Sequence, residues 1–195
     1  MSKCVLCNKK IKFSRDCPAL NQVICSTCCG TKKVSEIKCT KDCKYFMEYE
    51  IKENRKGIVK LVKASFNKEA EDIYRDTSVL ELVAPFERFM FYTYYNCRNV
   101  NDDFIFDCYM KMYYSLDEKE TIYSFDEVET EIFNEYNKAA KKTKLSIESQ
   151  KLILLRMMKS VDNMTGGKFG NRMYLELLRN NFTNTGIVAD NIGKI

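Results

Sequence analysis

Cysteine is the residue type in this chain best suited to chemistry, since the sequence has ten cysteines and no histidine. Eight of them lie near the start of the chain: Cys4, Cys7, Cys17, Cys25, Cys28, Cys29, Cys39 and Cys43. The other two, Cys97 and Cys108, lie in apolar stretches with helical spacing, where a free cysteine usually acts as a small hydrophobic side chain. The first eight can form a reactive thiol centre, a set of disulfides or a metal site.

The spacing of the eight favours a metal site. Two Cys-x-x-Cys pairs, Cys4/Cys7 and Cys25/Cys28, have the spacing at which a tight turn directs both sulfurs to one ion. The last two of the eight are about one helical turn apart, which places both thiolates on the same face. Eight thiolates complete two tetrahedral zinc ions with no ligand left over. The sequence therefore predicts two zinc ions held by these cysteines.

The adjacent residues Cys28 and Cys29 point in different directions, so we expect them to bind different ions. A cross-braced arrangement follows, with Cys4, Cys7, Cys25 and Cys28 on one zinc and Cys17, Cys29, Cys39 and Cys43 on the other. Exchange of Cys28 and Cys29 between the ions is nearly as consistent with the spacing. Gly30 follows directly and is expected to adopt the positive φ that turns backbone amides toward the sulfurs.

Positive charge is concentrated in the cysteine-rich segment. Residues 1–46 contain ten lysine and arginine residues and three acidic residues, a formal charge of +7, whereas the whole chain carries +5 and residues 47–195 therefore −2. Eight thiolates and two zinc ions add −4, which leaves the loaded segment at about +3. Its apolar residues are few, so this segment is expected to need metal in order to fold.

The start of the chain, MSKCVLCNKKIKF, lacks the apolar core of a secretory signal, and no later run reaches the ~18 apolar residues of a membrane span. The expected location is the cytoplasm, with no membrane association. A reducing cytosol favours metal binding over disulfides. A thiol redox or metal-responsive sensor is an alternative, although redox-active Cys-x-x-Cys motifs normally lie in thioredoxin-like sheets, which the rest of the sequence does not indicate.

Two resemblances accompany this pattern. The order CxxC, CP, ICSxxC and CxxxC over residues 4–43 resembles the cross-braced zinc fingers of the MYND and HIT types, most of which are protein-interaction modules. Those families usually have a second cysteine near Leu20 and a histidine near Cys39, and both are missing here. The pattern CP, ICxxCCGTK and IxCxxDCxYF over residues 17–46 more closely resembles a cysteine block of uncharacterised prokaryotic zinc-binding proteins with helical tails. That resemblance implies a zinc module followed by helices and brings no known activity with it.

The remainder of the chain, residues 47–195, is predicted to be an all-α domain because its apolar residues recur at helical spacing. A long helix is expected to leave the cysteine module, with Gly57 as its weak point. The predicted fold is therefore mainly α, with a small cross-braced, treble-clef-like two-zinc module at residues 1–46 followed by the helical domain.

Local patterns predict where several helices begin. Capping-box patterns at residues 78–81 and 124–127 predict helix starts near 79 and 125. Asn101 and Ser146 are the expected caps of two further helices, and a last helix is expected after Gly170.

Eleven of the 24 phenylalanine and tyrosine residues lie between Phe86 and Tyr114. Aromatic residues at helical spacing usually pack in a core, which is the expectation here. The alternative is a tyrosine-lined groove for a peptide or a nucleobase.

Catalytic signals are weak. Without histidine, the Ser-His-Asp and Cys-His arrangements are excluded. Asp102, Asp103 and Asp107 have carboxylates suited to Mg²⁺, yet acids at a helix start more often act as caps. The sequence favours a non-enzymatic zinc-binding adaptor or regulatory protein that binds another protein. Alternatives are a zinc-dependent regulator that binds nucleic acid through the basic module, and the thiol sensor above.

Overall fold

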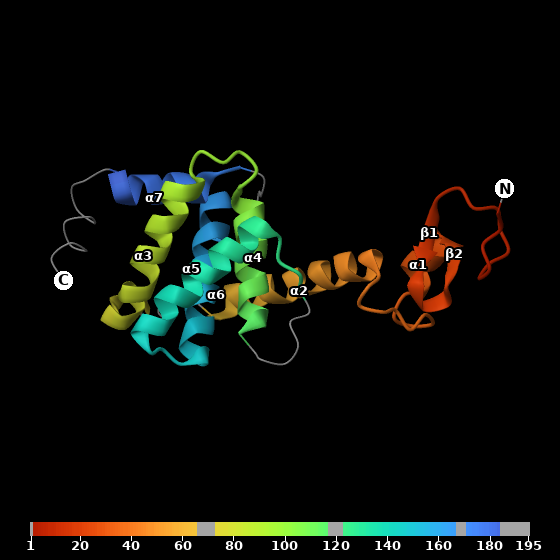
Figure 1. The fold of residues 1–195 in the computed structure, drawn as a ribbon, viewed down its shortest axis with the longest axis horizontal. Coiled ribbons are helices and arrows are strands. Elements are labelled where there is room, and N and C mark those ends of the chain that lie inside the picture. Colours follow the sequence, from red (N-terminus) through yellow and green to blue (C-terminus); the bar gives the residue numbers. More distant parts are fainter. Residues whose placement is uncertain (1, 66–72, 117–122, 167–170, 184–195) are drawn as a thin grey trace. The chain divides into compact units, whose positions relative to one another are not determined.

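The structure, a computed structural model, describes residues 2–65, 73–116, 123–166 and 171–183 (Figure 1). It is 69% helical, with seven α-helices and one short strand pair in the described residues, so the mainly-α prediction is confirmed. The chain divides into two compact units, Met1–Gly57 and Ile58–Ile195. The division falls inside helix α2 (Lys44–Ser65), beyond the boundary predicted at residue 46.

The N-terminal unit is built around a small β-hairpin. Strand β1 (Ser14–Cys17) pairs antiparallel with β2 (Gln22–Cys25), and the 3-10 turn η1 (Pro18–Leu20) connects them. Asn21 closes the turn in the left-handed region at φ 50°, with its N–H donating to the carbonyl of Pro18. Helix α1 (Ser26–Lys32) follows β2 directly and packs against both strands.

The second unit is a helical bundle. Its elements, besides the end of α2, are η2 (Ile73–Arg75), α3 (Thr77–Tyr94), α4 (Asp102–Ser115), α5 (Glu127–Thr143), α6 (Ile147–Thr165) and α7 (Met173–Thr183). Helix α3 packs against α5, and α4 packs against α6. Helix α7 contacts α3 and α6 and crosses one end of the bundle (Figure 1). In the described part of the chain, none of the helices combines the length and the apolar character needed to span a bilayer.

Two helix starts lie where the sequence predicts them. The Asn101 side chain accepts a hydrogen bond from the backbone N–H of Phe104 at 2.9 Å and caps α4. Ser146 accepts from the N–H of Ser149 at 3.1 Å and caps α6. These side chains satisfy N–H groups that the first helical turn leaves without partners.

For two other helices, the sequence predicts the wrong side chain as the N-cap. Helix α3 is capped by Asp76, and α5 by Asp126 within a capping box that uses Glu129. The predicted serine caps at residues 78 and 124 lie two residues away in each case. Asp is as good a cap as Ser, so the serine patterns alone could not decide between neighbouring candidates.

The aromatic segment belongs to the core. Phe86, Phe91, Tyr94, Phe106 and Tyr109 are all buried, which confirms the packing interpretation. Their helices α3 and α4 pack mainly against α5 and α6 rather than against each other.

Asp102 acts as a helix cap, although for a helix far away in the sequence. Its side chain is fully buried and accepts from the N–H of Met173 at 2.8 Å and from that of Tyr174 at 3.1 Å. The carboxylate thus accepts from two free backbone N–H groups at the start of α7 and links that helix to the start of α4. The cap interpretation therefore accounts for this acid better than Mg²⁺ does.

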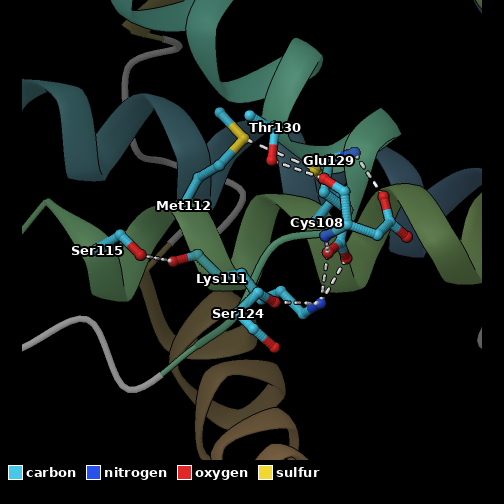
Figure 2. A network of polar contacts seen from close by, with 8 residues as sticks. Cys108, Lys111, Met112, Ser115, Ser124, Glu129 and Thr130 are labelled. Carbon is cyan, nitrogen blue, oxygen red and sulfur yellow. Dashed lines mark hydrogen bonds and ion pairs between the residues drawn. The ribbon is translucent and has the colours of Figure 1, made fainter.

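A buried ion pair joins α4 to α5 (Figure 2). Nζ of Lys111 lies 2.6 Å from both carboxylate oxygens of Glu129, and the two side chains are only 15% and 6% exposed. Glu129 also accepts from the backbone N–H of Asp126 at 3.0 Å, as part of the α5 capping box. The pair thereby links the cap of α5 to the surface of α4.

Candidate metal centre

Cys4 and Cys7 are brought together by a tight turn. The N–H of Asn8 donates to the carbonyl of Cys4 at 2.7 Å, and the N–H of Cys4 donates to the carbonyl of Lys9 at 2.9 Å. Asn8 adopts a positive φ of 55°, which reverses the chain directly after the second cysteine. The turn therefore brings the two sulfurs close together.

Cys25 and Cys28 are positioned by the junction of β2 and α1. Cys25 is the N-cap of α1, and its sulfur accepts from the N–H of Cys28 at 3.3 Å. The N–H of Cys25 donates in turn to the sulfur of Cys4 at 3.3 Å. This bond joins the helix start to the turn at the beginning of the chain.

The four sulfurs of Cys4, Cys7, Cys25 and Cys28 all lie within 4.8 Å of one another, and we call them the four-cysteine cluster. The sulfurs of Cys7 and Cys25 are 3.8 Å apart. Tetrahedral coordination with Zn–S bonds of about 2.3 Å requires sulfur separations of about 3.8 Å. Cys4 and Cys28 are buried and the other two are half-buried. The cluster has the composition and the compactness to hold one metal ion.

The electrostatics of the cluster call for a cation. Backbone N–H donors, chiefly that of Cys25, lower the pKa of Cys4 to about 6, which favours its thiolate. The neighbouring sulfurs, first that of Cys25, together with burial raise the pKa of Cys28 to about 12. Four thiolates cannot share so small a volume without a compensating charge, and a bound dication supplies it while displacing the remaining protons.

The structure groups Cys28 with this cluster and leaves Cys29 outside it, as in the first of the two predicted arrangements. The other four predicted ligands are Cys17, Cys29, Cys39 and Cys43. Within the described residues, these four do not form a second set of ligand atoms as compact as the first. The second zinc site stays a prediction.

Cys29 has a partner that the sequence did not indicate. Nη1 of Arg15 donates to its sulfur at 3.3 Å, and the guanidinium of Arg15 lies 4.3 Å from the centre of the Tyr45 ring. Cys17 and Cys29 are buried in one core with Ile24, and Cys39 packs against that core. Three cysteines of the second set, Cys17, Cys29 and Cys39, therefore share one core, and the positive charge of Arg15 lies beside Cys29.

The expectation for Gly30 was wrong. Gly30 lies within α1 and has no positive φ. A Cys-Cys-Gly sequence can continue a helix, because cysteine and glycine both tolerate helical angles. The left-handed position that shapes the cluster is Asn8.

Cys97 and Cys108 lie apart from the cluster, in the second unit. Cys108 is fully buried on α4, with its sulfur 3.9 Å from that of Met112, and burial raises its pKa well above the usual value (Figure 2). The thiol of Cys97 donates to the carbonyl of Thr93 at 3.6 Å. Cys108 thus acts as a small core side chain of a helix, as the sequence predicts, whereas Cys97 lies in the segment between α3 and α4 and is only half-buried.

A hollow of about 400 Å³ adjoins the four-cysteine cluster. Its lining comprises Cys7, Lys9, Lys10, Lys12, Phe13, Cys25, Ser26, Thr27 and Cys28. The signal for this hollow in the sequence is the KKIKF run at residues 9–13, in which three lysines precede an aromatic residue. The Phe13 side chain is 75% exposed, so the hydrophobic core does not account for this residue.

No protein-family model, curated protein or solved structure matches this chain.

Proposed function

We propose that this protein is a non-enzymatic zinc-binding adaptor of the cytoplasm, which acts by binding another protein. The observation that carries the proposal is the four-cysteine cluster. Thiolate ligands select zinc over the harder cations Mg²⁺ and Ca²⁺, which prefer oxygen. Four sulfur ligands fill every tetrahedral position, so the zinc has no open site for a water molecule or a substrate. Its role is structural.

The zinc would stabilise the N-terminal unit. Among the described residues of that unit, Ile24 and Ile37 are the only buried aliphatic side chains, and cysteines make up the rest of its core. Such a core is too small to hold the turn, the hairpin and α1 together by apolar burial alone. A metal bound by residues from all three supplies the missing free energy.

We extend the proposal to a second zinc held by Cys17, Cys29, Cys39 and Cys43. The first three share the core of the unit or pack against it, and Cys43 is buried just before α2. Arg15 donates a hydrogen bond to the sulfur of Cys29 and places a positive charge beside it. The second ion would join α1 to the segment that enters α2.

An adaptor role is supported by the surface of the N-terminal unit. Val5, Phe13 and Val34 are 55%, 75% and 59% exposed on a unit with very few buried apolar residues. Exposed apolar side chains of this size on a small folded unit suit contacts with a partner protein. A histidine-free chain with a closed metal site offers no comparable support for catalysis.

The adaptor proposal is tested by reconstitution. A tagged chain is crosslinked to its neighbours in the cells that make it, and the identified protein is purified and titrated with the wild type, Cys4→Ser and Cys97→Ser. The expected result is binding by the wild type and by the Cys97→Ser control, and weakened binding by Cys4→Ser. Equal binding by Cys4→Ser and the wild type would contradict a zinc-dependent adaptor. So would a salt-sensitive complex with nucleic acid in place of any protein partner.

A further inference from the structure

We propose that the hollow beside the four-cysteine cluster is the docking site for an acidic segment of a partner protein, with carboxylates on Lys9, Lys10 and Lys12 and an apolar side chain on Phe13. This inference rests on the adaptor function and names the chemistry of the partner.

The hollow is large enough to accept side chains of a partner. Its volume of about 400 Å³ lies in the range of sites that accept one or two side chains or a small ligand. Three cysteines of the cluster form one part of the wall, and three lysines with Phe13 form another. The cluster thus fixes the backbone that carries the lysines and Phe13. Metal binding would therefore preorganise the lining of the hollow.

The lysines that line the hollow favour a negatively charged partner. Lys9, Lys10 and Lys12 are exposed, and none of them forms an ion pair with another described residue. No acidic residue lines the hollow. Elsewhere in the same unit, Lys32 is neutralised by Glu36 at 2.6 Å. The zinc-loaded four-cysteine cluster in the wall carries −2, so the three lysines leave the hollow with a net charge of about +1, and their exposed ammonium groups complement carboxylates.

Phe13 offers the hollow an apolar contact for a partner. Its side chain is 75% exposed, yet its backbone is held in place, because its carbonyl accepts from the N–H of Ser26 at 3.0 Å. An aromatic ring that is exposed on a fixed backbone gains free energy when a partner covers it, at little cost in backbone ordering. A leucine, phenylalanine or tyrosine between acidic residues would supply that cover.

The composition of the surface favours an acidic peptide over nucleic acid. Recognition of phosphates and bases depends strongly on arginine, whose planar fork binds them in a bidentate manner. Arg15 is the only arginine in residues 1–46, and it is engaged with the sulfur of Cys29 and the ring of Tyr45. Single strands also stack successive bases on several aromatic residues, whereas Phe13 is the only aromatic residue in the hollow.

The test uses the full zinc-loaded chain and a fluorescein-labelled synthetic peptide of glutamates interrupted by leucines. Anisotropy titrations compare it with a matched peptide in which glutamine replaces glutamate, and with labelled oligothymidine. The variant Lys9→Ala/Lys10→Ala/Lys12→Ala is compared with Lys3→Ala/Lys38→Ala, which removes exposed lysines outside the hollow. Phe13→Ala is measured separately, and the zinc content of each variant is measured as the control for folding.

The inference predicts that the acidic peptide binds and that the glutamine peptide does not. The triple variant should weaken binding by about tenfold or more, and Phe13→Ala by several-fold, at unchanged zinc content, while the Lys3/Lys38 control binds like the wild type. Equal binding by the triple variant and the control would overturn the inference, and so would tighter binding of oligothymidine than of the acidic peptide. If the inference fails while the crosslinked partner still binds in a zinc-dependent manner, the adaptor proposal stands and its interface lies elsewhere.

Discussion

Replacing Lys111 by methionine should destabilise the second unit strongly. Methionine keeps most of the apolar stem and removes the charge. Glu129, whose side chain is 6% exposed, would then lose the positive charge beside its buried carboxylate and retain the hydrogen bond from the N–H of Asp126 at 3.0 Å. Removing one partner of a buried ion pair typically costs about 3–5 kcal/mol, because the other charge is left uncompensated.

The free energy of unfolding is measured by urea titration followed by circular dichroism. The exposed pair of Lys138 and Glu135, 3.1 Å apart, provides the control, and Lys138→Met should change stability by less than about 0.5 kcal/mol. The double variant Lys111→Met/Glu129→Gln should recover a substantial part of the loss, since the amide carries no charge and its oxygen can still accept from the N–H of Asp126. A loss below about 1 kcal/mol for Lys111→Met would refute the view that this pair is buried and mutually dependent.

Two further predictions concern carboxyl groups in the same unit, that of the half-buried Glu87 and that of the fully buried Asp102. Burial raises the pKa of Glu87 to about 7 from an ordinary value of 4.5, while its carboxylate accepts from the hydroxyl of Tyr174 at 2.9 Å. The folded state therefore holds this proton more tightly than the unfolded state, so stability falls as pH rises from about 4.5 to 7 and levels off above that window. Glu87→Gln should remove this pH dependence of the free energy of unfolding. In paired urea titrations at pH 8 the variant should be more stable than the wild type by up to about 3 kcal/mol. Identical pH profiles for the variant and the wild type would contradict the raised pKa of Glu87. Asp102→Ala should cost about 2–4 kcal/mol and raise amide hydrogen exchange at Met173, because two N–H groups at the start of α7 lose their acceptor; unchanged exchange there would contradict the assigned cap.

Helix positions were largely predictable from the sequence, because caps act locally. Asn101 and Ser146 each bond an N–H within three residues, so the pattern of the chain is enough to find them. Asp76 and Asp126 were missed because serines two residues away offered equivalent chemistry. The strands β1 and β2 could not be predicted, because each is only four residues long and neither carries an alternating apolar pattern.

The first half of the cysteine site was also predictable, because a Cys-x-x-Cys pair is a local signal and two such pairs suggest one ion. The sequence could not decide between Cys28 and Cys29, since that choice depends on how α1 is rotated relative to β2. It also could not indicate that Arg15 contacts Cys29 or that Lys111 pairs with Glu129. In both cases the partners are far apart in the sequence and meet only when the chain folds.

The central claim is that the four-cysteine cluster holds a zinc ion. The most direct test is native mass spectrometry with elemental analysis on the wild type, Cys4→Ser and Cys108→Ser, each purified without added metal. The proposal predicts two zinc ions in the wild type and in the Cys108→Ser control, and fewer in Cys4→Ser, which lacks a ligand of the cluster. A wild-type chain without zinc, or a Cys4→Ser chain with as much zinc as the wild type, would contradict the claim.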